Sequence, residues 1–66
     1  MLFRSTHADF VAKMSIALKE ARETRYWLRL LQQSQLVSLD FSAQLDSAEE
    51  LVRILTAIVK TAQART

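Results

Sequence analysis

The sequence predicts an all-α protein, an antiparallel helical hairpin that associates into an up-and-down four-helix-bundle-type assembly. Three observations support this prediction. The 66 residues include neither Gly nor Pro, so no residue type that commonly interrupts a helix is present. Apolar residues recur at three- and four-residue steps through two long segments, which is typical of amphipathic helices. The connection between these segments is short, and short connections favour antiparallel neighbours.

We expect the first helix over about residues 7–34. Thr6 and Asp9 have the spacing of a capping box, in which each side chain satisfies a free backbone N–H group. Asp9 also suits the positive end of the helix dipole. A single apolar stripe then follows the helix and predicts its buried side: Phe10, Met14, Ala17, Leu18, Ala21 and Leu28.

We expect the second helix over about residues 41–64, with two possible starts. Ser47 and Glu50 have capping-box spacing, which favours a start at Ser47. Ser38 or Asp40 is the alternative cap, because the apolar pattern begins before Ser47. The predicted inner side of this helix has these apolar members: Phe41, Leu45, Ala48, Leu51, Val52, Leu55, Ile58, Val59 and Ala62.

The first helix also carries a second apolar set near the opposite side, made of Ala12, Ile16, Trp27 and Leu30. Burying a large apolar side chain contributes about 1.5–3 kcal/mol, whereas ordering each residue costs roughly 1.5 kcal/mol. A single contact between two helices does not offset that cost. We therefore expect the chain to self-associate, with Ile16, Trp27 and Leu30 in the oligomer interface.

Three arginines gather on one side of the first helix. Arg22, Arg25 and Arg29 fall within about 60° of one another around the axis, with Tyr26 beside them. One interpretation is a basic surface that binds the phosphates of RNA or DNA, with Tyr26 available to stack on a base. The other is ion pairing with acidic residues of the same or a neighbouring helix. Both interpretations stay open at the level of the sequence.

Other functional classes receive little support from the residues. His7 stands alone near the first cap, where a capping or surface role is expected, and no paired acid and nucleophile suggests catalysis. Tyr26 and Trp27 point about 100° apart, so we do not expect them to form one stacking platform. We expect no enzyme activity, catalytic residue, metal, cofactor or small-molecule substrate. Short apolar runs predict no membrane contact, and we expect a cytoplasmic protein.

Two segments carry a specific resemblance. The first runs from Ser5 to Leu31 and includes the thirteen-residue stretch KEARETRYWLRLL, residues 19–31. The second is AEELVRILTAIVKTA, residues 48–62. Together they resemble the C-terminal half of the four-helix bundle family, also called the 23S rRNA intervening-sequence protein family.

The resemblance implies a fold and a function class. Family members form up-and-down four-helix bundles that assemble into rings, described as pentamers. Related proteins are accessory factors of reverse transcriptases in diversity-generating retroelements, where a basic surface is thought to bind nucleic acid. The resemblance therefore implies a non-catalytic, homo-oligomeric protein of bacterial type whose precise role is unknown. The alternative that it implies is an accessory factor that binds RNA or DNA.

Two departures from the family pattern affect these expectations. The family's first two helices have no counterpart here, so we expect a shortened relative, a product of a misplaced start codon, or a fragment. Gln35 stands where members often place Gly to end a helix in a left-handed turn. A residue other than Gly costs about 1 kcal/mol there if the turn is kept. A dimer of hairpins and a pentamer both remain possible assemblies.

Overall fold

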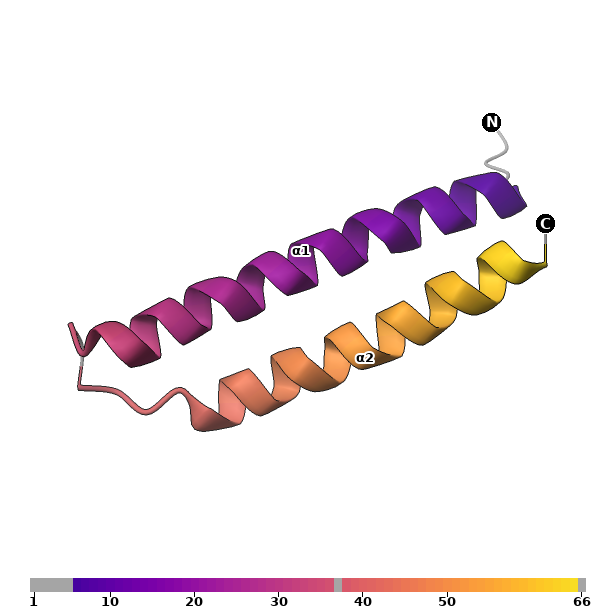
Figure 1. Ribbon diagram of the computed structural model, residues 1–66. Coiled ribbons are helices and arrows are strands. Elements are labelled where there is room, and N and C mark those ends of the chain that lie inside the picture. Colours follow the sequence, from indigo (N-terminus) through magenta and orange to yellow (C-terminus); the bar gives the residue numbers. More distant parts are fainter. Residues whose placement is uncertain (1–5, 37, 66) are drawn as a thin grey trace, which may run out of the picture.

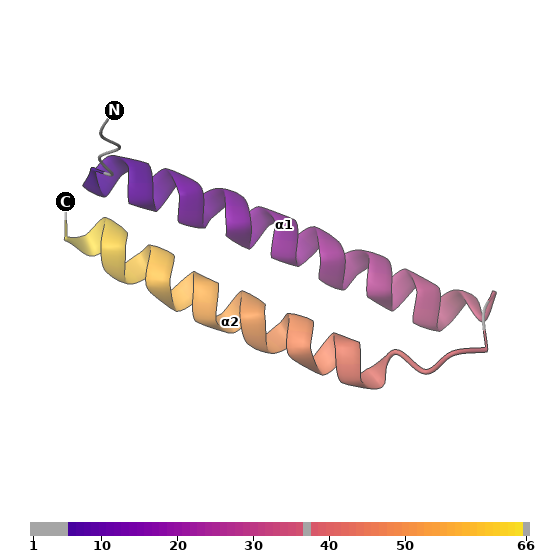
Figure 2. The same cartoon turned by 180° about the vertical axis from the view of Figure 1, so that it is seen from behind.

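The computed structural model describes residues 6–36 and 38–65 and shows two α-helices. α1 spans His7–Ser34 and α2 spans Ser42–Ala64. The two helices lie side by side in opposite directions, so that the start of α1 and the end of α2 share one end of the molecule (Figure 1, Figure 2). The predicted helical hairpin is confirmed, and the described residues contain no strand.

Some of the expectations fall on residues that the structure does not describe. Residues 1–5, 37 and 66 lie outside the described residues. They include Ser5, at the start of the resemblance, and Val37, in the predicted connection. The bounds found for α1 are those expected from the sequence, and α2 starts one residue later than expected.

α1 begins with the predicted cap. Thr6 is extended, with φ −88° and ψ 170°, and its side chain accepts a hydrogen bond from the Asp9 N–H at 3.0 Å. The Thr6 carbonyl accepts from the Phe10 N–H at 3.0 Å, which is the first helical hydrogen bond. Thr6 thereby satisfies a backbone donor that the helix itself leaves without a partner.

α1 ends in a left-handed turn without glycine. Gln35 has φ 59° and ψ 20°, in the left-handed helical region. Ser34 supports the turn, because its hydroxyl donates to the Leu31 carbonyl at 3.0 Å and accepts from the Leu36 N–H at 3.2 Å. A side chain with a Cβ atom is strained in this region, by about 1–2 kcal/mol. The hairpin therefore forms at the cost of strain at Gln35.

Replacing Gln35 with Gly should stabilise the hairpin. Glycine adopts the left-handed conformation without this strain, although it adds entropy to the unfolded chain. We expect Gln35→Gly to raise the free energy of unfolding by about 0.5–1 kcal/mol, measured by urea denaturation at a fixed protein concentration. The matched control Gln33→Gly lies inside α1 and should lower it by a similar amount. A loss of stability in Gln35→Gly would contradict the strain argument.

α2 begins near the earlier of the two predicted starts, but its N-cap residue is Phe41, which makes no side-chain cap hydrogen bond, and not Ser38 or Asp40. Asp40 Oδ1 accepts from the Ser42 N–H at 3.0 Å and from the Ser42 hydroxyl at 2.7 Å, and the Phe41 carbonyl accepts from the Leu45 N–H at 2.8 Å. The start at Ser47 is wrong, because this residue lies inside α2. Phe41 and Leu45 are half-buried, and their packing extends the helix before Ser47.

The core lies along the line where the two helices meet. Leu18 and Ala21 of α1 pack with Val52 and Val59 of α2, and Met14 and Leu55 pack against this cluster. Ala48 and Ala62 are buried along the same line. Short alanine side chains at these points allow the backbones to approach closely. The apolar stripes predicted from the sequence thus meet at their centres.

The edges of the predicted stripes are not covered. Phe10 and Leu51 were expected on the buried sides, but they are 42% and 48% exposed. This part of the prediction is wrong for a physical reason. The Cα atoms extend only 14 Å in the thinnest direction, little more than one helix, so the hairpin is a single layer. Each helix has one neighbour, which covers only the middle of its stripe.

Candidate functional site

The arginine side of α1 is joined to α2 by one carboxylate. Glu49 accepts a hydrogen bond from Arg29 at 2.6 Å and lies 3.7 Å from the Arg25 guanidinium. These side chains are all between 26% and 49% exposed. The neighbouring Glu50 instead pairs with Arg53 inside α2. Two of the three arginines proposed to contact nucleic acid therefore have an acidic partner in the hairpin itself.

Arg22 and Tyr26 are exposed and lie beside the arginines that pair with Glu49. Among residues 6–36 and 38–65, Arg22 makes no ion pair. Tyr26 is 57% exposed and contacts Trp27, with ring centroids 5.5 Å apart and ring planes at 71°. The two rings touch edge to face, so they form one aromatic patch but not one flat platform on which a base stacks.

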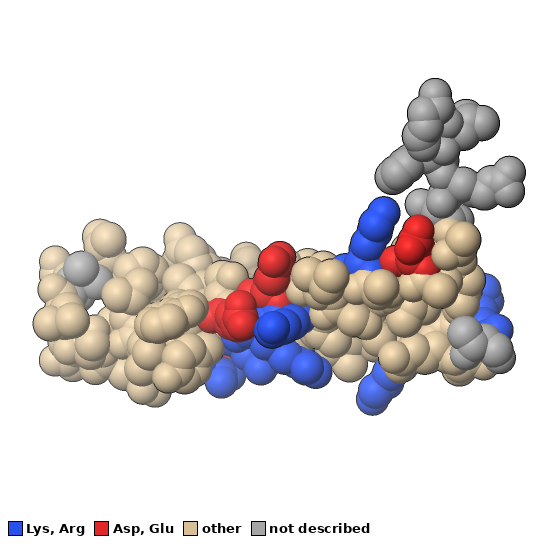
Figure 3. Space-filling view, turned by 90° about the horizontal axis from the view of Figure 1, so that it is seen from above, with Lys and Arg blue, Asp and Glu red and all other residues tan. Residues whose placement is uncertain are grey.

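The charged side chains are unevenly distributed along the molecule. Figure 3 looks onto the side of α1 that faces away from α2, and shows acidic and basic groups gathered near the middle and toward the start of α1. The end near the connection shows neither acidic nor basic side chains in this view. The stretch of residues 30–39 contains no Asp, Glu, Lys or Arg. On the face seen in this view, this end of the hairpin is uncharged.

The predicted interface residues form an exposed surface, which we call the outer ridge. It consists of Ile16, Trp27 and Leu30 on α1, which are 57%, 60% and 38% exposed. These residues lie within about 60° of one another around the helix axis, on the side opposite the core residue Leu18. The hairpin leaves the outer ridge uncovered, as expected for residues that α2 does not reach.

Sequence reasoning did not find two pockets between the helices. The connection pocket, near the connection, has a volume of about 510 Å³. Its lining contains small and apolar side chains and uncharged polar ones: Ala21, Thr24, Leu28, Ala43, Gln44, Ser47, Ala48 and Leu51. No acidic or basic residue is among these described lining residues. Its sequence signal is that Leu28, Ala48 and Leu51 belong to the predicted apolar stripes.

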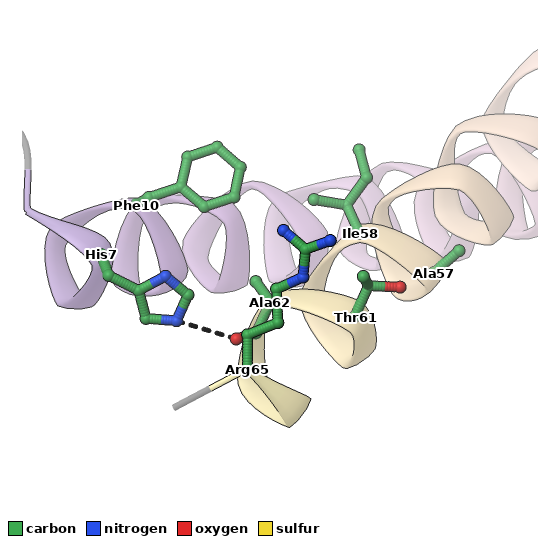
Figure 4. Close-up of a pocket in the computed structure, with 7 residues that line it drawn as sticks. All are labelled: His7, Phe10, Ala57, Ile58, Thr61, Ala62 and Arg65. Atoms are coloured by element: carbon green, nitrogen blue, oxygen red, sulfur yellow. Dashed lines mark hydrogen bonds between the residues drawn. The ribbon is translucent and has the colours of Figure 1, made fainter.

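The terminal pocket lies at the other end of the hairpin and has a volume of about 390 Å³ (Figure 4). His7 borders it and donates from Nε2 to the Ala62 carbonyl oxygen at 2.8 Å. This carbonyl also accepts from the Arg65 N–H at 3.2 Å. His7 therefore caps the end of α2, not its own helix. Arg65 extends from the end of α2 toward Phe10 and Ile58 in Figure 4.

The connection is held against α1 by Gln32. Its side-chain carbonyl accepts from the Phe41 N–H at 2.8 Å, and its amide donates to Asp40 Oδ1 at 3.4 Å. Hydrogen bonds from the Ser42 hydroxyl, the Ser42 N–H and the Gln32 amide lower the pKa of Asp40 below its ordinary value. Each of these donors stabilises the ionised carboxylate. Asp40 thus fixes the start of α2 in its charged form.

The lowered pKa of Asp40 makes a pH-dependent contribution to stability. A carboxyl group with a lower pKa in the folded state stabilises the fold above its unfolded pKa and loses this contribution as the pH falls through the folded pKa. The contribution should therefore decline below about pH 4. We expect Asp40→Asn to unfold at a lower temperature than the natural chain at pH 6, with the difference shrinking toward pH 2.5. A constant difference across this range, measured by circular dichroism, would contradict the assignment.

Other kinds of site are not supported by the part of the chain that the structure describes. Within it, no group of three or more His, Cys, Asp or Glu side chains is placed to hold a metal ion. Neither α1 nor α2 is long and apolar enough to cross a membrane. Comparison with protein-family models, curated proteins and solved structures finds no match for this chain.

Proposed function

We propose that this chain is a non-catalytic, homo-oligomeric helical-bundle protein of the 23S rRNA intervening-sequence type that acts in the cytoplasm. In this proposal the hairpin is the subunit, and copies associate to complete a bundle of four or more helices. The resemblance of residues 5–31 and 48–62 supports the family assignment. The proposed role is that of an assembling subunit, without a substrate or cofactor of its own.

The observation that carries this proposal is the amount of apolar surface left open by the hairpin. Trp27 and Ile16 are more than half exposed, and Leu51 and Phe10 nearly so. Among the described residues none is both large and fully buried. A chain of this length has a core that seldom contributes more than about 3–5 kcal/mol. Association covers the exposed side chains and supplies the stability that one layer of helices lacks.

The mass of the protein in solution tests the proposal. We expect light scattering after size exclusion to give at least twice the chain mass of 7.6 kDa at micromolar concentration. We also expect the thermal unfolding midpoint to rise with protein concentration, because association stabilises the folded state. A 7.6 kDa species that unfolds cooperatively at a concentration-independent temperature would refute self-association.

The second candidate function is binding of RNA or DNA by a repeated basic surface. The exposed Arg22 and Tyr26 favour it, because assembly repeats these side chains around the oligomer. The ion pairs of Arg25 and Arg29 with Glu49 oppose it, since they offset two of the positive charges. The same mass measurement with a short RNA at low salt tests this candidate. The affinity for RNA should fall steeply as the salt concentration rises. Arg22→Ala should reduce the slope of log affinity against log salt concentration by about 1.

A further inference from the structure

The two pockets lie on the same face of the hairpin. Phe10 and Leu28 are eighteen residues apart, or about five turns at 3.6 residues per turn, so they project in the same direction from α1. Leu51 and Ile58 are seven residues apart, or about two turns, and project together from α2. Phe10 and Ile58 line the terminal pocket, and Leu28 and Leu51 line the connection pocket. The two pockets thus open on one face of the hairpin, and we call this face the apolar groove.

The apolar groove combines projecting and recessed parts. Leu51 is 48% exposed and stands at the border of a recess formed partly by Ala21, Ala43 and Ser47. Facing copies related by a two-fold axis exchange equivalent contacts, so a projection that fits a recess of the partner makes that contact twice. The groove is therefore suited to pairing with itself.

The charges at the two ends of the groove set the direction of pairing. Arg65 borders the terminal pocket. Toward the other end, Asp46 and Glu50 line a shallow recess on α2 that they share with Leu51, and Glu50 also pairs with Arg53. In an antiparallel pair, Arg65 of one copy lies near the acidic end of its partner, whereas a parallel pair brings two Arg65 side chains together. The lining residues of the connection pocket are uncharged, so they place no charge of their own in the interface.

The face is large enough for a stable pair. At 1.5 Å per residue, α2 is roughly 34 Å long, and two adjacent helices are roughly 20 Å wide. The projected area of this face is then roughly 700 Å². The projecting side chains make its surface area larger than this projection. A standard interface buries about 800 Å² on each partner. A second hairpin would also supply the second layer of helices that a stable domain requires.

We propose that the apolar groove binds the apolar groove of a second copy, antiparallel about a two-fold axis, so that two hairpins form one four-helix core. This inference rests on the proposed function and names the surface by which the copies associate. The outer ridge, which faces away from α2, stays free on each copy for assembly beyond the pair.

Matched lysine substitutions test which surface forms the pair. Leu51→Lys places a charge in the groove, and Ile16→Lys places the same charge on the outer ridge. Both residues are exposed in the single hairpin, so neither change disturbs the core. We expect Leu51→Lys to raise the dissociation constant of the pair about 100-fold, by sedimentation equilibrium, and Ile16→Lys to change it less than about threefold. If Ile16→Lys weakens the pair more than Leu51→Lys does, the groove is not the surface that forms the pair, although the copies still self-associate. If the natural chain is a monomer, the proposed function is refuted as well.

Cross-linking tests the direction of pairing directly, and a mixed antiparallel pair retains one Arg65 opposite one Asp46. The chain has no cysteine, so Asp46→Cys and Arg65→Cys each introduce a single thiol. A short bismaleimide added to an equal mixture of the two variants should give mainly the mixed dimer if the copies are antiparallel. Predominant linking of Arg65→Cys to itself would show parallel pairing and overturn this arrangement. Absence of the mixed product at concentrations where the pair forms would overturn it also.

Discussion

Leu18→Ala is expected to unfold most of the protein at low concentration. Leu18 is 8% exposed and packs at the centre of the only core cluster among the described residues. Replacing a buried Leu by Ala typically costs about 2–5 kcal/mol. A chain this short rarely has more than about 3–5 kcal/mol of stability from its own core. The substitution therefore removes most or all of the stability of the isolated hairpin.

Circular dichroism at 222 nm measures this effect as a loss of helical signal. Lys19→Ala, at the next position, is the matched control, because Lys19 is exposed and Ala favours helix. We expect this control to change the free energy of unfolding by less than about 0.5 kcal/mol. Raising the concentration of Leu18→Ala should restore part of the signal, because association stabilises the folded chain. Full helical signal at low concentration would show that the core lies elsewhere.

The helices follow from local patterns in the sequence. Apolar spacing and the Thr6 cap define α1. These features are predictable because they depend on neighbours in the chain. Ser47 misled the prediction for α2, because the capping-box pattern is equally compatible with a position inside a helix. The hydrogen bonds that Asp40 accepts and the packing of Phe41 decide in favour of the earlier start.

Contacts between the helices were less predictable. Periodicity shows which side of a helix is apolar, but it gives neither the offset along the partner helix nor the extent of coverage. His7 bonds to the Ala62 carbonyl although the two residues are 55 positions apart in the sequence. This contact depends on how far one helix is shifted along the other. The exposure of Phe10 and Leu51 similarly depends on the hairpin being a single layer. The sequence suggested that the arginines pair with acidic residues of a neighbouring helix. The relative shift of the two helices is needed to identify Glu49 as the partner shared by Arg25 and Arg29.

Reversing the charge of Glu49 should destabilise the hairpin in the half nearer the connection. In Glu49→Lys, two attractive contacts with Arg25 and Arg29 become repulsive. Exposed ion pairs each contribute about 0.2–1 kcal/mol, because water screens them. These side chains are partly exposed, so we expect a total loss on the order of 1–2 kcal/mol. Urea denaturation at a fixed protein concentration measures this loss.

Glu50→Lys is the control that separates contact between the helices from net charge. It makes the same charge change at the adjacent position, but Glu50 pairs with Arg53 on its own helix. Losing such a pair and replacing it by repulsion costs about 0.5–1 kcal/mol. In 1 M salt the screening length falls to about 3 Å, so the two variants should converge in stability. Equal destabilisation at low salt would mean that Glu49 does not join α1 to α2 in solution. A larger, salt-sensitive effect of Glu49→Lys would show that its carboxylate draws Arg25 and Arg29 toward α2.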